Sequence, residues 1–382
     1  MNLFLSDTQK LLNDMIESGL EDLIKMRYRP DPWPATLGHY LDVLIAYAQG
    51  DESTIESLNA QLKAVGPKSR VLEILTQLRG DIIRRQISRA LCETAMEVVQ
   101  MDNCTEDGCD WSGELLIVVA FALETRGDEL DACQCYQRAE LALLQSGAKK
   151  KALRARHNAI CVQSHADPER RILEPYREVY QQARRLKEYS LAGQSALNLC
   201  WEFILLKAYG AALTLLNRAL GLLSRKSGSR DHDLALLQRS LVLGLSGRAK
   251  EAYLAAEAAA HNESVEVRSV FKLLRSLEEK NWKLDSPDLE LLPIPKYWRQ
   301  NLELLMRDSR APLSPNENRV IYLLCFRARK FNELSLALYG NRMRPEVTKP
   351  RLEQLLSGLR KKRPDLIEYR EGKYRLHQQT LG

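Results

Sequence analysis

The feature that most constrains the fold of this chain is a pattern of small and large residues that returns at a fixed interval. Three helix-forming segments carry a small residue, a second residue four positions later that is large in two of the three, and a small residue three positions after that. The first residues of the three sets stand 80 and then 40 positions apart. Small residues at fixed positions let antiparallel helices approach closely, and large residues fill the remaining gaps. The sets are Ala132/Tyr136/Ala139, Ala212/Leu216/Ala219 and Ala252/Ala256/Ala259.

Other positions follow the same interval. A small residue lies 12 positions before each set, and a large residue follows it three positions later. These residues are Ala120, Cys200 and Ser240, followed by Leu123, Phe203 and Leu243. A further copy is degenerate and keeps only bulky residues, at Ile172, Tyr176 and Val179. Upstream, Gly50-Asp51 and Gly80-Asp81 are predicted to be the turns of more helix pairs.

This pattern resembles a tetratricopeptide (TPR) repeat, in the longer version of roughly 40 residues that occurs in bacterial regulators. The resemblance implies a mainly α fold, a TPR-like α-solenoid of helix-turn-helix repeats. Stacked helix pairs of this kind present a concave face that binds proteins, peptides or small ligands. We therefore expect residues 1–284 to form a sensing or interaction domain.

The composition agrees with a helical protein of the cytoplasm. Eight cysteines without a disulfide framework indicate reduced thiols. The first residues, MNLFLSDTQK, lack the basic start of a secretion signal. The longest apolar run, Leu115 to Leu123, is too short to span a bilayer and predicts a buried helix. We expect a cytoplasmic localisation and no membrane partner.

Residues 1–290 contain no pattern typical of a catalytic centre, and we predict no catalytic residue, no metal and no cofactor. Cys104, Cys109, Cys133 and Cys135 could in principle hold zinc, as a thiol or zinc hydrolase would require. Their C-x4-C and C-x-C spacings are poor for that purpose, so small apolar roles are favoured. The basic segment Lys149 to His157 has two interpretations, an anion site on an inner face or a solvated helix end. The six histidines are scattered and form no recognisable pair.

Charge divides the chain unevenly. Residues 311–382 hold 15 Lys and Arg against 7 Asp and Glu, whereas the preceding part holds 41 against 43. A basic module on a nearly neutral body indicates a polyanionic partner for that module alone. Pro287, Pro293 and Pro295 break helix formation and mark the boundary. We expect a linker at 285–300 and a C-terminal domain at 301–382.

The C-terminal segment predicts three helices. Asn301 to Leu313 could supply a short strand pair before them. The first helix has Ser314 as N-cap, with Pro315 and Glu317 completing a capping box. We expect it to bury Val320, Leu323, Leu324 and the stem of Arg327. The second helix is capped by Asn332 and ends at Gly340, and the third begins near Thr348 with a leucine stripe. The stripe is Leu352, Leu355, Leu356 and Leu359.

Opposite this stripe lie small, polar and cationic residues. Gln354, Ser357, Gly358 and Lys361 face away from the leucines, flanked by Arg351 and Arg360. Such a surface fits the major groove of DNA, where Gln can contact adenine and Lys can contact guanine. A two-residue turn at Glu371-Gly372 would pair the flanking residues as a hairpin and place the apolar ones on one face. The predicted pairs are Arg370/Lys373, Tyr369/Tyr374, Glu368/Arg375 and Ile367/Leu376.

In order along the chain, LSPNE, LALYG, LSGLRKK and GKYRL resemble the OmpR/PhoB-type winged-helix domain of bacterial transcription regulators. The resemblance implies base-facing positions at Gln354, Ser357 and Gly358, a backbone position at Arg360 and a minor-groove position in the wing at Arg375. The sequence departs from the family at Lys373, where a second glycine is usual, and at Gly358, where an arginine is frequent. Taken with the groove face, the predicted base contacts are Arg351, Gln354, Ser357, Gly358 and Lys361, the backbone contacts are Lys349, Arg360 and Lys362, and the wing contacts are Lys373 and Arg375.

Together these patterns predict a bacterial transcription regulator that binds double-stranded DNA through a winged helix. Its repeats would bind a protein, a peptide or a small-molecule effector. A single module buries limited surface on DNA, so a homodimer or tandem sites are expected. The alternative is a non-enzymatic scaffold whose winged helix binds a protein, which Gly358 and the acidic Glu353 favour.

Overall fold

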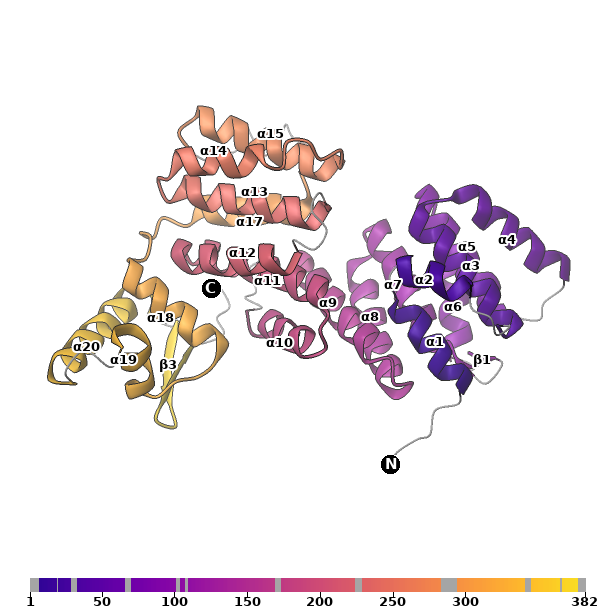
Figure 1. Ribbon diagram of the computed structural model, residues 1–382, viewed down its shortest axis with the longest axis horizontal. Coiled ribbons are helices and arrows are strands. Elements are labelled where there is room, and N and C mark those ends of the chain that lie inside the picture. The colour runs from indigo at the N-terminus through magenta and orange to yellow at the C-terminus, as the bar shows by residue number, and fades with distance from the viewer. Residues whose placement is uncertain are drawn as a thin grey trace. The chain divides into compact units, whose positions relative to one another are not determined.

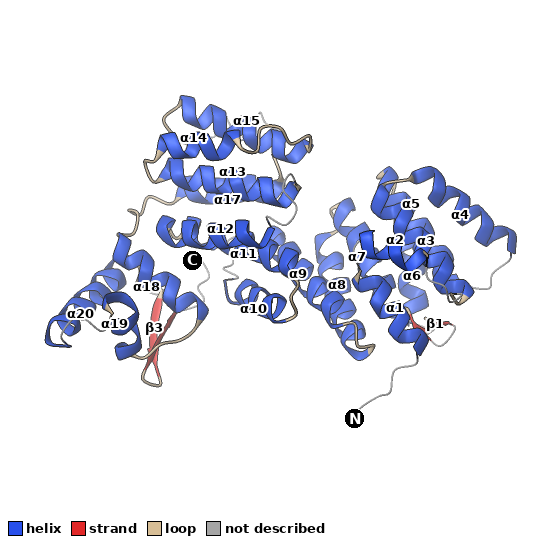
Figure 2. Cartoon of the chain, in the orientation of Figure 1, coloured by secondary structure: helices blue, strands red, loops and turns tan. Residues whose placement is uncertain are grey.

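A computed structural model describes residues 7–18, 20–28, 33–65, 70–100, 104–106, 109–168, 173–223, 229–282, 294–340, 345–364 and 366–376 (Figures 1 and 2). The chain forms two compact units, Met1–Ala166 and Asp167–Gly382, which we call the first and second units. The predicted fold class is confirmed: the protein is mainly α, with TPR-like helical repeats followed by a small α+β winged-helix domain. Among the described residues, no helix has the length and apolarity needed to cross a membrane.

The first unit is built of antiparallel helix pairs and one very short hairpin. Gly50 ends the third helix in the left-handed conformation at φ 70°, so the predicted turn at Gly50-Asp51 is present. The predicted turn at Gly80-Asp81 is wrong, because the helix continues to Arg84 and turns at Arg85, φ 56°. Its elements are α1 (Asp7–Glu17), α2 (Leu20–Arg27), α3 (Ala35–Gln49), α4 (Glu52–Val65), α5 (Arg70–Arg84), α6 (Arg89–Gln100), β1 (Thr105–Glu106), β2 (Cys109–Asp110), α7 (Ser112–Arg126), α8 (Glu129–Gln145) and α9 (Lys149–Ala166).

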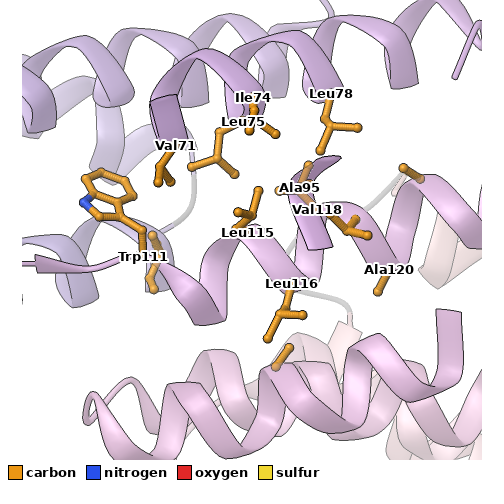
Figure 3. Close-up of a cluster of buried hydrophobic side chains, with 14 of the residues drawn as sticks. Val71, Ile74, Leu75, Leu78, Ala95, Trp111, Leu115, Leu116, Val118 and Ala120 are labelled. Atoms are coloured by element: carbon orange, nitrogen blue, oxygen red, sulfur yellow. The ribbon is translucent and has the colours of Figure 1, made fainter. Parts of the chain in front are cut away.

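The core of the first unit centres on α7, which carries the apolar run predicted to be a buried helix. Leu115 and Val118 lie with side chains of α5 such as Leu75 and Leu78, and Leu116 lies toward the helices on the other side (Figure 3). Trp111, directly before α7, is fully buried. Burial of an aliphatic side chain of this size contributes about 1.5–3 kcal/mol to folding, so α7 anchors its neighbours on both sides.

The second unit continues the repeats and ends in the winged helix. Three helices, α18, α19 and α20, pack together with a two-stranded hairpin (Figure 1). The elements are α10 (Leu173–Arg185), α11 (Tyr189–Leu205), α12 (Tyr209–Leu223), α13 (Arg230–Leu245), α14 (Ala249–Glu257), α15 (Val265–Glu279), α17 (Lys296–Arg307), α18 (Pro315–Phe326), α19 (Phe331–Tyr339), α20 (Pro345–Lys362), β3 (Ile367–Arg370) and β4 (Lys373–Leu376). We call α18 to β4 the C-terminal module.

The predicted repeat positions are buried in both units. Every member of the three small–large–small sets is at most 3% exposed. The small residues that precede the sets also bond across the helix pair: the Cys200 thiol donates to the Ala212 carbonyl at 3.7 Å, and the Ser240 hydroxyl donates to the Ala252 carbonyl at 2.7 Å. The same contact therefore recurs one repeat later. In the degenerate copy Tyr176 and Val179 are buried, and Ile172 lies outside the described residues.

Helix α17 differs from the sequence prediction. Residues 301–307 are helical, so the expected strand pair over 301–313 is wrong. The helix starts at Lys296, inside the segment assigned to the linker, and residues 285–293 lie outside the described residues. Its buried stripe is Trp298, Leu302 and Leu305, spaced by four and then three residues. Trp298 packs edge-on against Trp201 of α11, with ring centroids 4.9 Å apart. The domain boundaries at 284 and 300 stay a prediction.

Details of the three C-terminal helices also need correction. The predicted capping box of α18 is confirmed, with the Ser314 hydroxyl and the Glu317 carboxylate each bonding the other's backbone amide. Arg327 is exposed in extended backbone after the helix and buries no stem. Helix α19 is capped at Lys330 rather than Asn332, although it ends at Gly340 as predicted. Helix α20 begins at Pro345, before the predicted start near Thr348.

Candidate functional site

The candidate site of the C-terminal module is the exposed side of α20. The helix is amphipathic: Leu352, Leu356 and Leu359 are at most 3% exposed, and Leu355 is half-buried. These leucines face α18 and α19, which pack against α20. The leucine stripe therefore fixes the rotation of the helix about its axis, and with it the side that solvent can reach.

The polar side of α20 carries the residues predicted to contact DNA bases and backbone. Gly358 is half-buried, and a Cβ built on it would meet no atom within 4 Å, so the surface is open at this point. Glu353 is exposed on the same helix and adds a negative charge. Lys349, Arg351, Gln354, Ser357, Arg360 and Lys361 are all exposed.

A hollow of about 360 Å³ lies between α20 and the hairpin. Ser357, Arg360 and Lys361 line it from the helix, and Tyr374 lines it from β4. The Arg360 guanidinium stands over the Tyr374 ring, 5.7 Å from its centroid. Cations are attracted to the face of an aromatic ring, so Tyr374 holds the Arg360 charge between helix and hairpin.

The hairpin has the predicted register. The four pairs are those given above, from Arg370↔Lys373 to Ile367↔Leu376. The turn residues have positive φ, 54° at Glu371 and 72° at Gly372, which is typical of the two-residue turns that match strand twist. Backbone bonds between Arg329 and Tyr374, of 2.9 and 2.7 Å, attach the hairpin to the α18–α19 connection. The wing is thus held from the helix side as well as by its own turn.

The two wing cations differ in their surroundings. Lys373 is exposed beside the turn. The Arg375 guanidinium donates to both carboxylate oxygens of Glu368 on the opposite strand, at 3.2 and 2.9 Å. A carboxylate neutralises much of the charge of its partner, so Lys373 is the wing cation more available to a phosphate.

Lys362, predicted to contact the DNA backbone, has a partner inside the module. Its ammonium donates to the Glu317 carboxylate at 2.9 Å. Burial favours the neutral form of Glu317, but the bonds from Lys362 and from the Ser314 amide and hydroxyl outweigh it and lower the pKa of the carboxyl. Lys362 therefore joins the end of α20 to the start of α18, a role that the sequence alone did not indicate.

The module is attached to the repeats by side chains that cap helix ends, and sequence reasoning missed them. The Asn318 side-chain oxygen of α18 accepts from the amides of Gly210 and Ala211 in the first turn of α12, at 3.0 and 3.3 Å. In return, Arg177 and Gln181 of α10 donate to the last carbonyls of α18, at 2.9 and 3.1 Å. Helix ends leave such amides and carbonyls without intrahelical partners, so each side completes the other's helices.

Lys207 makes a second attachment. Its φ of 54° is unusual for a residue with a side chain, and Gly247 has the equivalent turn 40 positions later. The Lys207 ammonium donates to the Asp308 carbonyl, and its own carbonyl accepts from the Leu313 amide at 3.2 Å. The segment before α18 is therefore fixed to the repeat turn at both of its ends.

The basic segment at the start of α9 lies within the first unit. Lys151 stands 3.6 Å from the Glu114 carboxylate, which is only 1% exposed. Glu114 also accepts from the Tyr40 hydroxyl at 2.6 Å and from the Arg79 guanidinium at 2.5 Å. The anion that Lys151 meets is thus a side chain of the protein itself.

The charges of this cluster depend on one another. Burial disfavours the ionised form of Glu114, but attraction by Lys151 and Arg79 outweighs it, so the pKa of the Glu114 carboxyl is lowered. Burial also lowers the pKa of Lys151, and the nearby Glu114 opposes that change. Glu114 therefore stays ionised between two cations in a site closed to water, and it connects α3, α5, α7 and α9.

Of the four cysteines considered as zinc ligands, Cys104, Cys109 and Cys135 are buried and Cys133 is half-buried. Burial raises the pKa of Cys92 and of Cys135 to about 11, so both thiols keep their protons at neutral pH. A protonated thiol is a poor nucleophile and a poor metal ligand. Within the described part of the chain, no group of three or more His, Cys, Asp or Glu side chains is placed to hold a metal ion.

His157 of α9 predicts a pH dependence of stability. Burial, assisted by Arg154, lowers its pKa to about 4. The unfolded chain binds a proton near pH 6.5, the native protein does not, and stability is therefore lost as pH falls from 6.5 toward 4. We expect the free energy of unfolding to fall by about 1.6 kcal/mol between pH 6.5 and 5 because of His157, and we expect the His157→Gln variant to lack this decrease. Urea unfolding at both pH values measures it, and equal slopes for the two proteins would contradict it.

Comparison with known proteins gives a likeness of fold. No protein-family model and no curated protein matches the sequence. The repeats place the chain in the class of TPR-like helical-repeat proteins, here with a C-terminal winged helix. The apo form of the quorum sensor NprR from B. thuringiensis is similar to it with a TM-score of 0.53 and 15% identity, over 91% of this chain and 97% of that chain. The apo form of RapI has a TM-score of 0.52 and 13% identity, over 93% and 96%.

Proposed function

We propose that this protein is a DNA-binding transcription regulator whose winged helix enters the major groove. The observation that carries the proposal is the exposed cationic and polar side of α20, which lies beside the wing. The buried leucine stripe fixes the orientation of the helix, so this side faces solvent. An α-helix fits the major groove, and cations on its flanks position it through phosphates. Gln354 and Ser357 would contact bases, and the open surface at Gly358 would let the backbone approach closely.

The cations divide into two groups in this proposal. Lys349, Arg360, Lys361 and Lys373 are exposed, and each would bind a phosphate. Lys361 would in addition reach a base edge. Arg375 and Lys362 would contribute less, because each already has a carboxylate partner. The OmpR/PhoB-type resemblance supports this assignment through the order of the elements.

The repeats would sense an effector, and the protein would act as a bacterial regulator in the cytoplasm. The likeness of its fold to a quorum sensor supports a sensing role for the repeats. One module contacts few base pairs, so a homodimer on paired half-sites would supply the specificity that one copy lacks.

The test is binding of the full chain to random duplex DNA across a salt series. Four phosphate contacts predict a slope of about −4 in a plot of log affinity against log salt concentration. The affinity would then fall about two hundredfold between 50 and 200 mM salt, since each contact releases roughly one counterion. Fluorescence anisotropy of a labelled duplex measures this, and absence of binding at 50 mM salt would contradict the proposal.

A second function is favoured by Glu353. An acidic residue on the side of α20 that would face phosphates disfavours DNA, and a protein partner would accept it. In that case the module is an interaction surface of a scaffold. No DNA binding at low salt, together with capture of a partner that tolerates high salt and is lost in Ser357→Trp, would favour the scaffold.

A further inference from the structure

A cleft of about 820 Å³ lies within the second unit, between the repeats and the C-terminal module. One wall comes from α12 and the turn after α13, including Tyr209, Leu213 and Leu245. The other wall comes from α18 and α19, including Leu323. Pockets that bind small molecules have about 300–1,000 Å³ and mostly apolar linings. This cleft has the size and the lining of such a pocket.

The polar groups of the lining are mostly paired within the protein. The Asn318 amide donates to the Leu313 and Ser314 carbonyls, at 2.8 and 2.9 Å, and its oxygen caps α12. The Thr214 hydroxyl donates to the Gly210 carbonyl at 2.9 Å. Because these polar groups already have hydrogen-bond partners inside the protein, an apolar ligand can cover them without supplying bonds of its own.

One lining residue, Arg319, differs. It is exposed at the cleft, and its guanidinium donates to the Leu338 and Ala337 carbonyls, at 3.0 and 3.2 Å. No described carboxylate pairs with it, so its positive charge is not neutralised by a described side chain.

Charge selects the class of ligand. Among the described residues, two arginines, Arg248 and Arg319, line the cleft, and no acidic residue does. Arg248 is paired with Glu251 at 2.7 Å, whereas the charge of Arg319 has no such compensation. A planar guanidinium with free charge suits a carboxylate or a sulfonate. A cationic or strongly polar ligand would find no partner here.

We propose that this cleft binds a small organic anion with an apolar body. The anionic head would bind Arg319, and the body would lie among Leu213, Leu245 and Leu323. The role of the cleft as an effector site rests on the proposed function, whereas the binding of the anion does not. Because repeats and module each supply one wall, the ligand would stabilise their attachment to each other.

The test uses two probes that differ only in the head group. 8-Anilinonaphthalene-1-sulfonate carries a sulfonate, and N-phenyl-1-naphthylamine is the same body without it. Titration calorimetry of the full chain is expected to show one sulfonate bound, about tenfold more tightly than the neutral probe, because a charge-assisted bond is the stronger one. Arg319→Gln is expected to abolish most of this difference.

Filling the cleft provides the second arm. Thr214 is exposed at the lining, so Thr214→Trp would occupy the cleft without entering the core. We expect it to weaken the sulfonate at least about tenfold, as loss of a ligand's apolar contacts does. Asn217→Trp, an exposed position on the same helix and away from the lining, is the matched control and should bind as the parent does.

Several results would overturn this inference. They are the absence of saturable binding, equal affinity for both probes, or unchanged binding in Thr214→Trp with a native melting curve. If Thr214→Trp does not fold, Arg319→Gln decides alone through the difference between the probes. The titrations contain no DNA, so their failure is separate from failure of the DNA-binding experiment.

Discussion

Replacing Arg360 and Lys361 with Ala together is expected to lower affinity for duplex DNA about a hundredfold at 100 mM salt. Each cation that contacts a phosphate releases about one counterion, and losing two such contacts should reduce the salt slope by about 2. Both side chains are exposed and lie outside the leucine stripe. The free energy of unfolding should fall by no more than about 1 kcal/mol, the cost of losing the contact between Arg360 and Tyr374.

The matched control is the replacement of Arg268 and Lys272 with Ala. Both are exposed cations on one helix of the second unit, α15, and their replacement removes the same net charge. We expect DNA affinity within about threefold of the parent, because long-range charge alone is screened at this salt concentration. Equal losses in both double variants would contradict a specific role for α20.

Replacing Glu114 with Ala is expected to destabilise the first unit by about 3–5 kcal/mol, because removing one partner leaves buried charges uncompensated. Arg79 and Lys151 would lose the carboxylate between them, and the Tyr40 hydroxyl would lose its acceptor. Urea unfolding followed by circular dichroism measures the change. Glu114→Gln should be intermediate, since it keeps an acceptor and removes the charge.

A surface ion pair of the same unit serves as the comparison. Glu93 bonds Arg89 at 3.1 Å, and their side chains are 64% and 59% exposed. Exposed pairs of this kind contribute about 0.2–1 kcal/mol, so Glu93→Ala should have a small effect. A similar small loss in Glu114→Ala would mean that water enters the cluster and solvates Arg79.

The sequence predicted best those features that local chemistry determines. The hairpin register follows from Glu371-Gly372, because only one alignment of the flanking residues places the apolar ones together. The repeat positions were visible because the same small residues return after 40 positions. The leucines of α20 likewise specify one buried side, whatever surrounds the helix.

The remaining features depend on residues far apart in the chain. Glu114 and Arg79 are 35 positions apart, and nothing in either local sequence requires a charge in the core. Asn318 caps a helix 108 positions before it. Helix α17 was misassigned because neighbouring prolines suggested extended chain, although Trp298, Leu302 and Leu305 already had helical spacing. The sequence did not indicate the Lys362–Glu317 pair, because a basic residue at the end of a helix that is predicted to bind DNA is readily assigned to a phosphate.

The exchange of helix caps between α10, α12 and α18 has a consequence for how such a protein can evolve. A winged helix that is independent of its neighbour can pass between regulators by gene fusion and fold in each of them. In this protein, removing the module would leave the first amides of α12 without their acceptor, the Asn318 side chain. A module moved to another protein would lack the donors from α10 that bond the last carbonyls of α18. The repeats and the C-terminal module should therefore be inherited together, and a substitution at Asn318 should destabilise both of them.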